Sequence, residues 1–213
     1  MRARAPFAAA SSTQSRRKNR ARVLEWGIGL AKNTLQSSAT RTGAWVFAYG
    51  SLMWNPEFEY LEVRPALLRG YHRAFCIFSH VYRGSAEKPG LVLGLDRGGA
   101  CRGRAFRISP AREAGVLVDL DAREQVTGVY LRRRLAIHFD GDLAGTSVRA
   151  EAYVADPAHL QYAGKVAPRK AAQIIAASSG SAGPNREYFE STVAHLETLG
   201  IRDRGLQRIQ KFL

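Results

Sequence analysis

Residues 45–54 read Trp45-Val46-Phe47-Ala48-Tyr49-Gly50-Ser51-Leu52-Met53-Trp54. The apolar, β-branched and aromatic content of the first five residues predicts a buried strand. Gly50 follows directly, and glycine permits a backbone conformation that a residue with a Cβ would resist. A sharp turn at this point leaves amide N–H groups directed outward, and such a turn can hold an anion. A strand that ends in Gly-Ser is also a common turn with no special function, so these residues alone leave both interpretations open.

The net charge of the chain is unevenly distributed. The 213 residues carry a formal charge of +14, which on its own would suggest nucleic acid or an acidic membrane surface as a partner. Residues 1–42 contain seven Arg and two Lys against one acid, Glu25, and so hold +8 of that total and leave +6 for the remainder. We therefore predict a basic, mostly disordered N-terminal extension, 1–42, followed by one folded domain, 43–213.

The extension is rich in Arg and Ser and poor in acids, as transit peptides are, but a solvated extension or an upstream reading of the start codon fits equally well. It lacks the uninterrupted apolar segment of a secretory signal. No apolar run in the chain approaches the roughly 20 residues that a membrane span needs. The sequence therefore predicts a soluble protein with no membrane partner, placed in the cytoplasm unless the extension directs it to an organelle.

The two cysteines, Cys76 and Cys101, have no CxxC spacing and no histidines at the intervals of a zinc site. Neither a metal site nor a disulfide framework is indicated, and a reducing compartment fits this usage. Cys76 lies within an apolar stretch, 74–78, that is typical of a buried strand. Because His72 and His80 are close in sequence, a nucleophilic role for Cys76 stays open.

The order of elements predicts an α+β fold with a strongly curved sheet or small barrel, one helix between strands, and helices grouped near the end. Ser109 and Pro110 are suited to the N-cap and first position of the middle helix, which we expect to reach about Gln125. The predicted strands, after the first, are 67–78, 91–95, 101–108, 129–139 and 148–154. The predicted C-terminal helices are 167–177, 185–199 and 203–212. Loops or turns are expected at 60–64, 82–90 and 96–99.

Three acids, Asp119, Asp121 and Glu124, lie near the C-terminus of the middle helix, where the helix dipole disfavours them. Val116 and Leu120 are spaced i,i+4 on the core face of this helix, and Glu124 continues the same row. A carboxylate in apolar surroundings has a raised pKa and can exchange protons near neutral pH. The alternative is a partly exposed glutamate paired with a nearby arginine.

Several motifs occur in order along the chain. They are residues 45–56, Gly70-Tyr71-His72-Arg73-Ala74-Phe75-Cys76, Arg83-Gly84 with Pro89-Gly90, and Arg123-Glu124 with Gly128-Val129-Tyr130. Together they resemble the motifs of the ChaC-type γ-glutamylcyclotransferases. Ala177-Ser178-Ser179-Gly180 and Asn185-Arg186-Glu187-Tyr188 are similar to the C-terminal helices of that family, so the resemblance covers roughly 44–212. Ala48, where members often have Gly, and the spacer 125–127 depart from the pattern without removing a reacting group.

This resemblance implies a γ-glutamylcyclotransferase-like fold and an enzyme that cleaves glutathione to 5-oxoproline and cysteinylglycine without a metal or organic cofactor. It implies that Glu124 is the general acid/base. It also implies that the γ-glutamyl group is held by the turn, with Arg83 and Tyr130 as further substrate-binding residues. The turn residues concerned are Tyr49, Gly50, Ser51 and Leu52.

The residues support such chemistry independently of the family. In a cyclisation the α-amine of the substrate attacks its own γ-carbonyl, so the protein need not supply a nucleophile. One carboxylate can take a proton from the attacking amine and return it to the departing one. Two alternatives stay open: another γ-glutamyl peptide or amine as substrate, and a basic nucleic-acid-binding module, although the concentration of charge in 1–42 argues against nucleic acid as the partner of the folded part.

Overall fold

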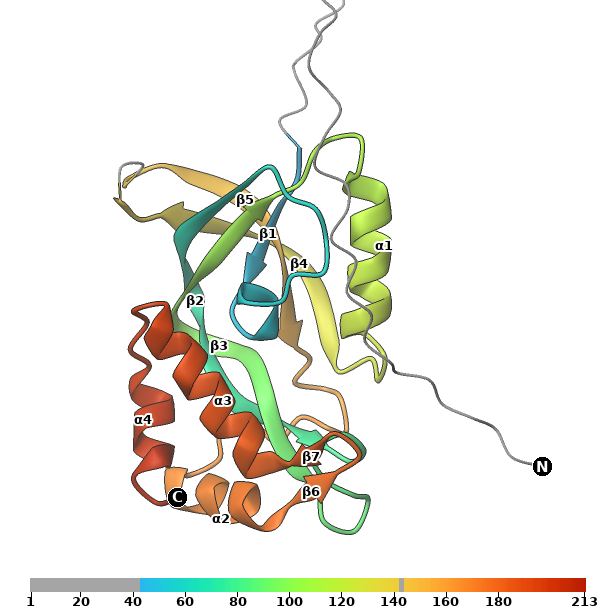
Figure 1. Cartoon of the computed structure of the whole chain (residues 1–213), viewed down its shortest axis with the longest axis vertical. Coiled ribbons are helices and arrows are strands. Elements are labelled where there is room, and N and C mark those ends of the chain that lie inside the picture. Colours follow the sequence, from blue (N-terminus) through green and yellow to red (C-terminus); the bar gives the residue numbers. More distant parts are fainter. Residues whose placement is uncertain (1–42, 142–143) are drawn as a thin grey trace, which may run out of the picture. The chain divides into compact units, whose positions relative to one another are not determined.

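The structure, a computed structural model, describes residues 43–141 and 144–213, and the predicted extension, 1–42, lies outside the described residues. Five strands close into a barrel in the order β1-β3-β2-β4-β5 (Figure 1). β1 pairs antiparallel with β3 and parallel with β5, which closes the barrel. The strands are β1 (Trp45–Ala48), β2 (Glu62–Ser79), β3 (Gly90–Arg107), β4 (Tyr130–Phe139) and β5 (Ser147–Ala155). The predicted α+β class and small barrel are confirmed.

β2 and β3 form one long ribbon of 18 residues each, so three local predictions are wrong. The expected turn at 96–99 is part of β3, because Tyr71 pairs with Arg97 on one side of it and Arg69 pairs with Ala100 on the other. Gly98 and Gly99, with φ of +92° and +70°, face the single residue Gly70, which makes a bulge that bends the ribbon. The two strands expected at 91–95 and 101–108 are therefore one continuous strand. The loop expected at 60–64 is shorter than predicted, because β2 begins at Glu62.

α1 (Glu113–Glu124) runs along one side of the barrel (Figure 1). Its Val116 and Leu120 are buried, and the Tyr153 hydroxyl of β5 donates a hydrogen bond of 2.8 Å to Asp121. The predicted start at Ser109 and Pro110 is wrong. The Ser109 carbonyl accepts the N–H of Arg112 at 3.0 Å, which closes a separate turn, and the helix begins after it.

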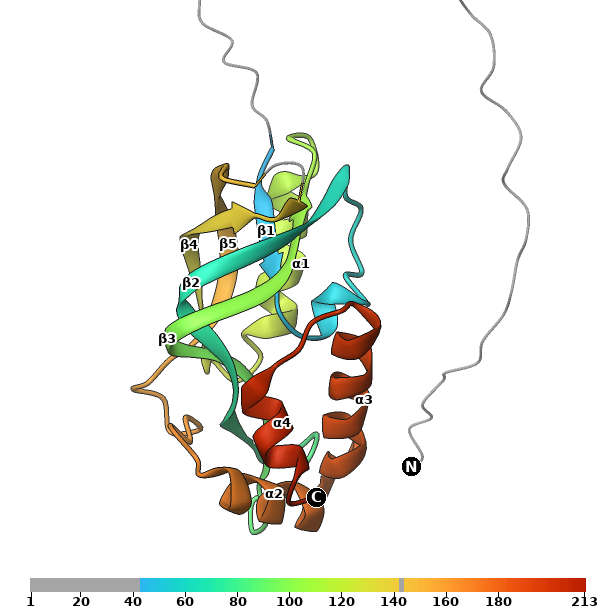
Figure 2. The same ribbon diagram turned by 90° about the vertical axis from the view of Figure 1, so that its left-hand side faces the viewer.

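Three C-terminal helices pack against the part of the β2–β3 ribbon that leaves the barrel (Figure 2). Phe75 of β2 and Phe189 of α3 have ring centroids 5.2 Å apart. The predicted positions of all three helices are confirmed to within a few residues: α2 (Pro168–Ala177), α3 (Asn185–Thr198) and α4 (Arg204–Gln210). A short strand pair, β6 (Ser179–Gly180) and β7 (Gly183–Pro184), joins α2 to α3. No helix in the described part of the chain is long and apolar enough to cross a bilayer.

Candidate active site

The turn after β1 contains a single turn of 3-10 helix, η1 (Ser51–Met53). The Gly50 carbonyl accepts the Met53 N–H at 2.9 Å, and the Ser51 carbonyl accepts the N–H groups of Trp54 and Asn55. The first amides of a helix have no partner inside it. Among residues 43–141 and 144–213, none provides an acceptor for the amides of Gly50, Ser51 and Leu52. The turn therefore presents successive N–H donors, as the sequence predicts.

Gly50 lines the pocket beside this turn. Its backbone has φ −129° and ψ −136°, a combination outside the helical and extended regions. A Cβ built on Gly50 would lie 3.6 Å from the Leu93 side chain, at ordinary contact distance. Because Leu93 and Gly50 line the same pocket, the missing side chain keeps that pocket open beside the turn.

A small pocket at this turn brings together six of the seven site residues predicted from the sequence. They are Tyr49, Gly50, Ser51, Leu52, Glu124 and Tyr130. Sequence reasoning missed four further lining residues: Phe47, Leu93, Tyr153 and Tyr188. Tyr188 lies within the motif at 185–188, which marked it as part of the resemblance without indicating a role. Glu124, some seventy residues from the turn in sequence, thus lines the same pocket in the folded chain.

Glu124 is the last residue of α1, and its side chain is 19% exposed. Burial raises the pKa of its carboxyl, and the Arg123 guanidinium, with Nε 3.4 Å from Glu124 Oε1, acts in the opposite direction. The sequence left two interpretations of Glu124 open, a buried carboxylate and a glutamate paired with an arginine. Both are correct, because the carboxylate is mostly buried and also lies beside Arg123. A carboxyl group with a raised pKa is suited to exchanging protons near neutral pH.

Arg123, which the sequence did not mark as a site residue, connects the turn to the end of α1. One of its terminal nitrogens donates to Ser51 Oγ at 3.2 Å, and the other donates to the Asn55 carbonyl at 3.2 Å and to Glu57 at 2.7 Å. The Ser51 hydroxyl is therefore held by an arginine.

Two tyrosines bind the backbone of Leu93 in the pocket wall. The Tyr130 hydroxyl donates to the Leu93 carbonyl at 2.5 Å, and the Leu93 N–H donates to the Tyr188 hydroxyl at 3.4 Å. Burial raises the pKa of Tyr188 to about 12 and also raises the pKa of Tyr130 and Tyr49. All three phenols therefore stay protonated and uncharged at neutral pH.

A second pocket of about 440 Å³ adjoins the first and shares Glu124, Tyr130 and Tyr188 with it. The seventh predicted residue, Arg83, lies here and not beside the turn. Its guanidinium donates to the Ala182 carbonyl at 2.5 Å and lies 5.2 Å from the centre of the Tyr188 ring. The lining residues Val81, Tyr82 and Val126 are more than half exposed, so this pocket is open to solvent.

Cys76 and Cys101 are both free and buried. Burial raises the pKa of the Cys76 thiol to about 12, so a thiolate is strongly disfavoured and the structure argues against Cys76 as a nucleophile. In the described part of the chain there is no cluster of three or more His, Cys, Asp or Glu side chains that could hold a metal ion.

The chain is similar to several known proteins. Residues 44–213 match the family described as ChaC-like protein. The glutathione-specific γ-glutamylcyclotransferase of Escherichia coli strain K12 is 39% identical over 162 residues, which cover 76% of this chain and 69% of that protein. Glutathione-specific γ-glutamylcyclotransferase 1 of Homo sapiens is 35% identical over 147 residues, which cover 68% of this chain and 66% of that protein.

Among solved structures, a glutathione-specific γ-glutamyl cyclotransferase from yeast superposes with a TM-score of 0.69. The match covers 80% of this chain and 97% of the yeast chain at 21% sequence identity, and so it establishes the shared fold.

Proposed function

Because this chain belongs to the ChaC-like protein family, we propose that it is a γ-glutamylcyclotransferase that cleaves glutathione to 5-oxoproline and cysteinylglycine. The observation that carries the proposal is the meeting of Glu124 with the amides of residues 50–52 in one pocket. That pocket combines a proton-transfer group with a set of anion-binding donors. Cyclisation of a γ-glutamyl group needs both.

The small pocket takes the γ-glutamyl group. The N–H groups of the turn, which have no partner among the described residues, bind its α-carboxylate or the oxyanion that develops on the γ-carbonyl oxygen. The tyrosine side chains at 49, 130, 153 and 188 surround the remaining carbon chain. Such walls hold the substrate folded, so that its α-amine lies next to its own γ-carbonyl.

Glu124 moves the protons of the reaction. Its carboxylate takes a proton from the α-amine as the nitrogen bonds to the γ-carbon and closes the five-membered ring. The bond from the γ-carbon to the cysteinyl nitrogen then breaks, and Glu124 returns the proton to that leaving amine. Atoms and charge balance within the substrate and one side chain. These steps use neither a protein nucleophile nor a cofactor.

The larger pocket receives the cysteinylglycine part of the substrate. It begins at Glu124, where the scissile bond lies in this arrangement, and continues to Arg83. Arg83 uses one terminal nitrogen for the Ala182 carbonyl, and its positive charge at this end of the pocket favours a substrate that carries a carboxylate. We also propose that the reaction takes place in the cytoplasm, because free thiols are usual in a reducing compartment.

The test is the release of 5-oxoproline from glutathione by the purified chain and its Glu124→Gln variant. We expect the variant to lose about 100-fold or more in turnover and to keep its fold, since Gln has the same shape without the basic oxygen. Asp119→Asn is the matched control, because Asp119 is an exposed acid on the same helix. Undiminished turnover in Glu124→Gln would contradict the mechanism.

A parallel assay with γ-glutamyl-lysine tests the substrate class. A γ-glutamyl amine lacks the cysteinylglycine portion that the larger pocket accommodates. We therefore expect 5-oxoproline to form much faster from glutathione. Preference for the amine would show that the fold acts on a different γ-glutamyl substrate.

A further inference from the structure

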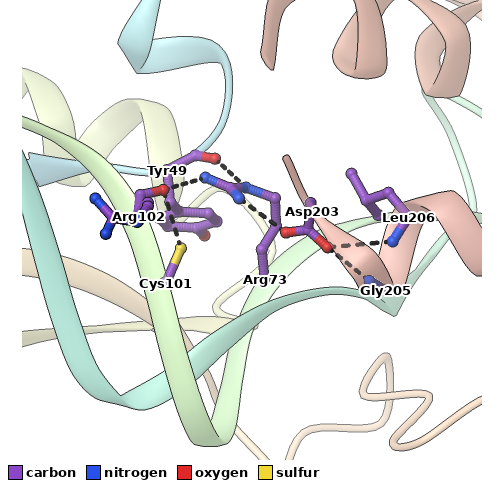
Figure 3. Close-up of polar contacts among 7 residues, drawn as sticks. All are labelled: Tyr49, Arg73, Cys101, Arg102, Asp203, Gly205 and Leu206. Carbon is purple, nitrogen blue, oxygen red and sulfur yellow. Dashed lines mark hydrogen bonds and ion pairs between the residues drawn. The ribbon is translucent and has the colours of Figure 1, made fainter. Parts of the chain in front are cut away.

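Arg73 of β2 is a buried charge that the proposed reaction does not use. Its side chain is 1% exposed, and it belongs to the motif of residues 70–76. Burying a charge is costly unless its partners satisfy it. Figure 3 shows the Arg73 guanidinium between the Tyr49 carbonyl and Asp203, with Arg102 on a third side.

The guanidinium binds three parts of the chain at once. Nε donates to the Tyr49 carbonyl at 2.6 Å, and one terminal nitrogen donates to the Arg102 carbonyl of β3 at 2.7 Å. The other terminal nitrogen donates to Asp203 Oδ2 at 2.9 Å. One side chain thus contacts the substrate turn, the barrel and the residue before α4.

We propose that Arg73 is a positioning residue that orients the Tyr49–Gly50 peptide of the substrate-binding turn, and that Asp203 holds Arg73 in place for this task. The inference rests on the function proposed above for that turn. In a trans peptide the C=O and N–H point in opposite directions. By holding the Tyr49 carbonyl, Arg73 fixes the direction in which the Gly50 N–H points.

Asp203 ties this arrangement to the C-terminal helix. Its Oδ1 accepts the N–H groups of Gly205 and Leu206, which caps the start of α4, while its Oδ2 accepts from Arg73. Each carboxylate oxygen of Asp203 therefore has its own partners, α4 for Oδ1 and Arg73 for Oδ2. A helix that is remote from Glu124 in sequence thus helps to hold the substrate turn.

A second arginine also binds a backbone carbonyl of this turn. Arg104 of β3 donates to the Met53 carbonyl at 2.9 Å, at the far end of the same turn. Both carbonyls are bound by arginines of β2 and β3, while the amides of residues 50–52 have no partner among the described residues. Arg104 is only partly buried, so Arg73 makes the more constrained of the two contacts.

The experiment compares Arg73→Lys, Asp203→Asn and a control, Ile209→Ala, with the wild-type chain. Lysine keeps the charge but cannot reproduce three hydrogen bonds in fixed directions. Asparagine keeps one oxygen to cap α4 and loses the carboxylate oxygen that accepts from Arg73. Ile209 is a buried residue of α4 whose truncation destabilises the same helix without removing a bond to Arg73.

We expect Arg73→Lys to lower kcat/KM for glutathione by about 10- to 100-fold, since small displacements at a reacting site have effects of this order. Asp203→Asn should show a smaller loss in the same direction. Ile209→Ala should stay within about twofold of the wild type at a temperature where all the proteins are folded. If Arg73→Lys does not fold, Asp203→Asn carries the test.

Hydrogen exchange of the peptide that covers residues 49–55 provides a readout that needs no activity, because the N–H groups of Met53, Trp54 and Asn55 are hydrogen-bonded within the turn. Faster exchange in Arg73→Lys and Asp203→Asn, but not in Ile209→Ala, supports the proposal. Unchanged exchange together with kcat/KM equal to that of the control overturns it. If the wild type releases no 5-oxoproline, the proposed function fails, and the exchange measurement still decides whether Arg73 orders the turn.

Discussion

At the scale of the residue, Glu124 combines two opposing effects. Burial raises the pKa of its carboxyl, and the adjacent Arg123 acts to lower it. Arg123 also holds the Ser51 hydroxyl and the Asn55 carbonyl, so the group that moderates the charge of Glu124 also fixes the turn. In the proposed reaction, the proton-transfer group and the substrate-binding turn therefore meet at the end of α1.

The raised pKa of Glu124 predicts a pH dependence of stability. A carboxyl whose pKa is higher in the folded state than in the unfolded state stabilises the fold fully below the unfolded value, near 4.5, and loses this contribution as pH rises through the folded pKa. Ionised Glu124 thus destabilises the folded state at neutral pH.

We expect Glu124→Gln to melt at a higher temperature than the wild type at pH 7 and at a similar temperature at pH 4. Thermal unfolding followed by circular dichroism at both pH values checks this, and a Glu124→Gln variant less stable at pH 7 would contradict it.

Ser51 distinguishes cyclisation from an acyl-enzyme mechanism. Its hydroxyl accepts a hydrogen bond from Arg123, which is not a base that could activate it. We expect Ser51→Ala to keep kcat/KM within about tenfold of the wild type, because one hydrogen bond to a charged donor is removed. Steady-state release of 5-oxoproline is the measurement. A loss of about 1,000-fold or more would instead point to Ser51 as a nucleophile.

At the scale of the element, Asn185 joins α3 to β3 in the manner of a neighbouring strand. Its side-chain nitrogen donates to the Leu91 carbonyl at 2.7 Å, and its oxygen accepts the Leu91 N–H at 2.7 Å. Asn185 is fully buried. The first residue of α3 thus satisfies both polar groups of one residue of β3, near the wall that carries Leu93.

Truncation of Asn185 tests this junction. Asn185→Ala leaves the Leu91 N–H and carbonyl buried without their partner, and we expect a loss of about 2–5 kcal/mol in the free energy of unfolding. Urea denaturation measures the loss. The control is Ser191→Ala at an exposed position of the same helix, with an expected change of about 0.5 kcal/mol or less. Equal effects for the two variants would refute the role of Asn185.

The elements also show what could be predicted from sequence. The strand Trp45–Ala48 was predictable from its own apolar and aromatic content, and the C-terminal helices from their local apolar periodicity. The continuity of β3 was not, because Gly98 and Gly99 have the composition of a hairpin turn and only their pairing with β2 makes them a bulge. Glu124 could be placed on the core face by its i,i+4 spacing. Tyr153 and Tyr188 reach the pocket through tertiary contacts that local patterns do not contain.

At the scale of the whole molecule, more than half of the net positive charge lies outside the part of the chain that forms the proposed active site. Residues 1–42 carry +8 of the total of +14, whereas the residues that line the two pockets lie between Phe47 and Tyr188. We expect deletion of 1–42 to leave kcat/KM for glutathione within about twofold of the full chain. The deletion should also remove any salt-dependent binding of nucleic acid, because such binding depends on the number of Lys and Arg side chains that neutralise phosphates. Activity assays and binding titrations at two salt concentrations check both statements, and a large loss of activity on deletion would show that the extension takes part in the reaction.

The two pockets that share Glu124 differ in the exposure of their lining residues, and in the proposed reaction this difference predicts an order of product release. The smaller pocket is walled by buried residues such as Phe47, Leu52 and Tyr153, whereas the larger one is edged by exposed side chains. We therefore expect cysteinylglycine to leave first and 5-oxoproline to stay longer in the smaller pocket, which the γ-glutamyl group of the next glutathione must enter. In initial-rate experiments 5-oxoproline should inhibit competitively and cysteinylglycine noncompetitively, so that accumulation of the cyclic product alone slows the capture of new substrate.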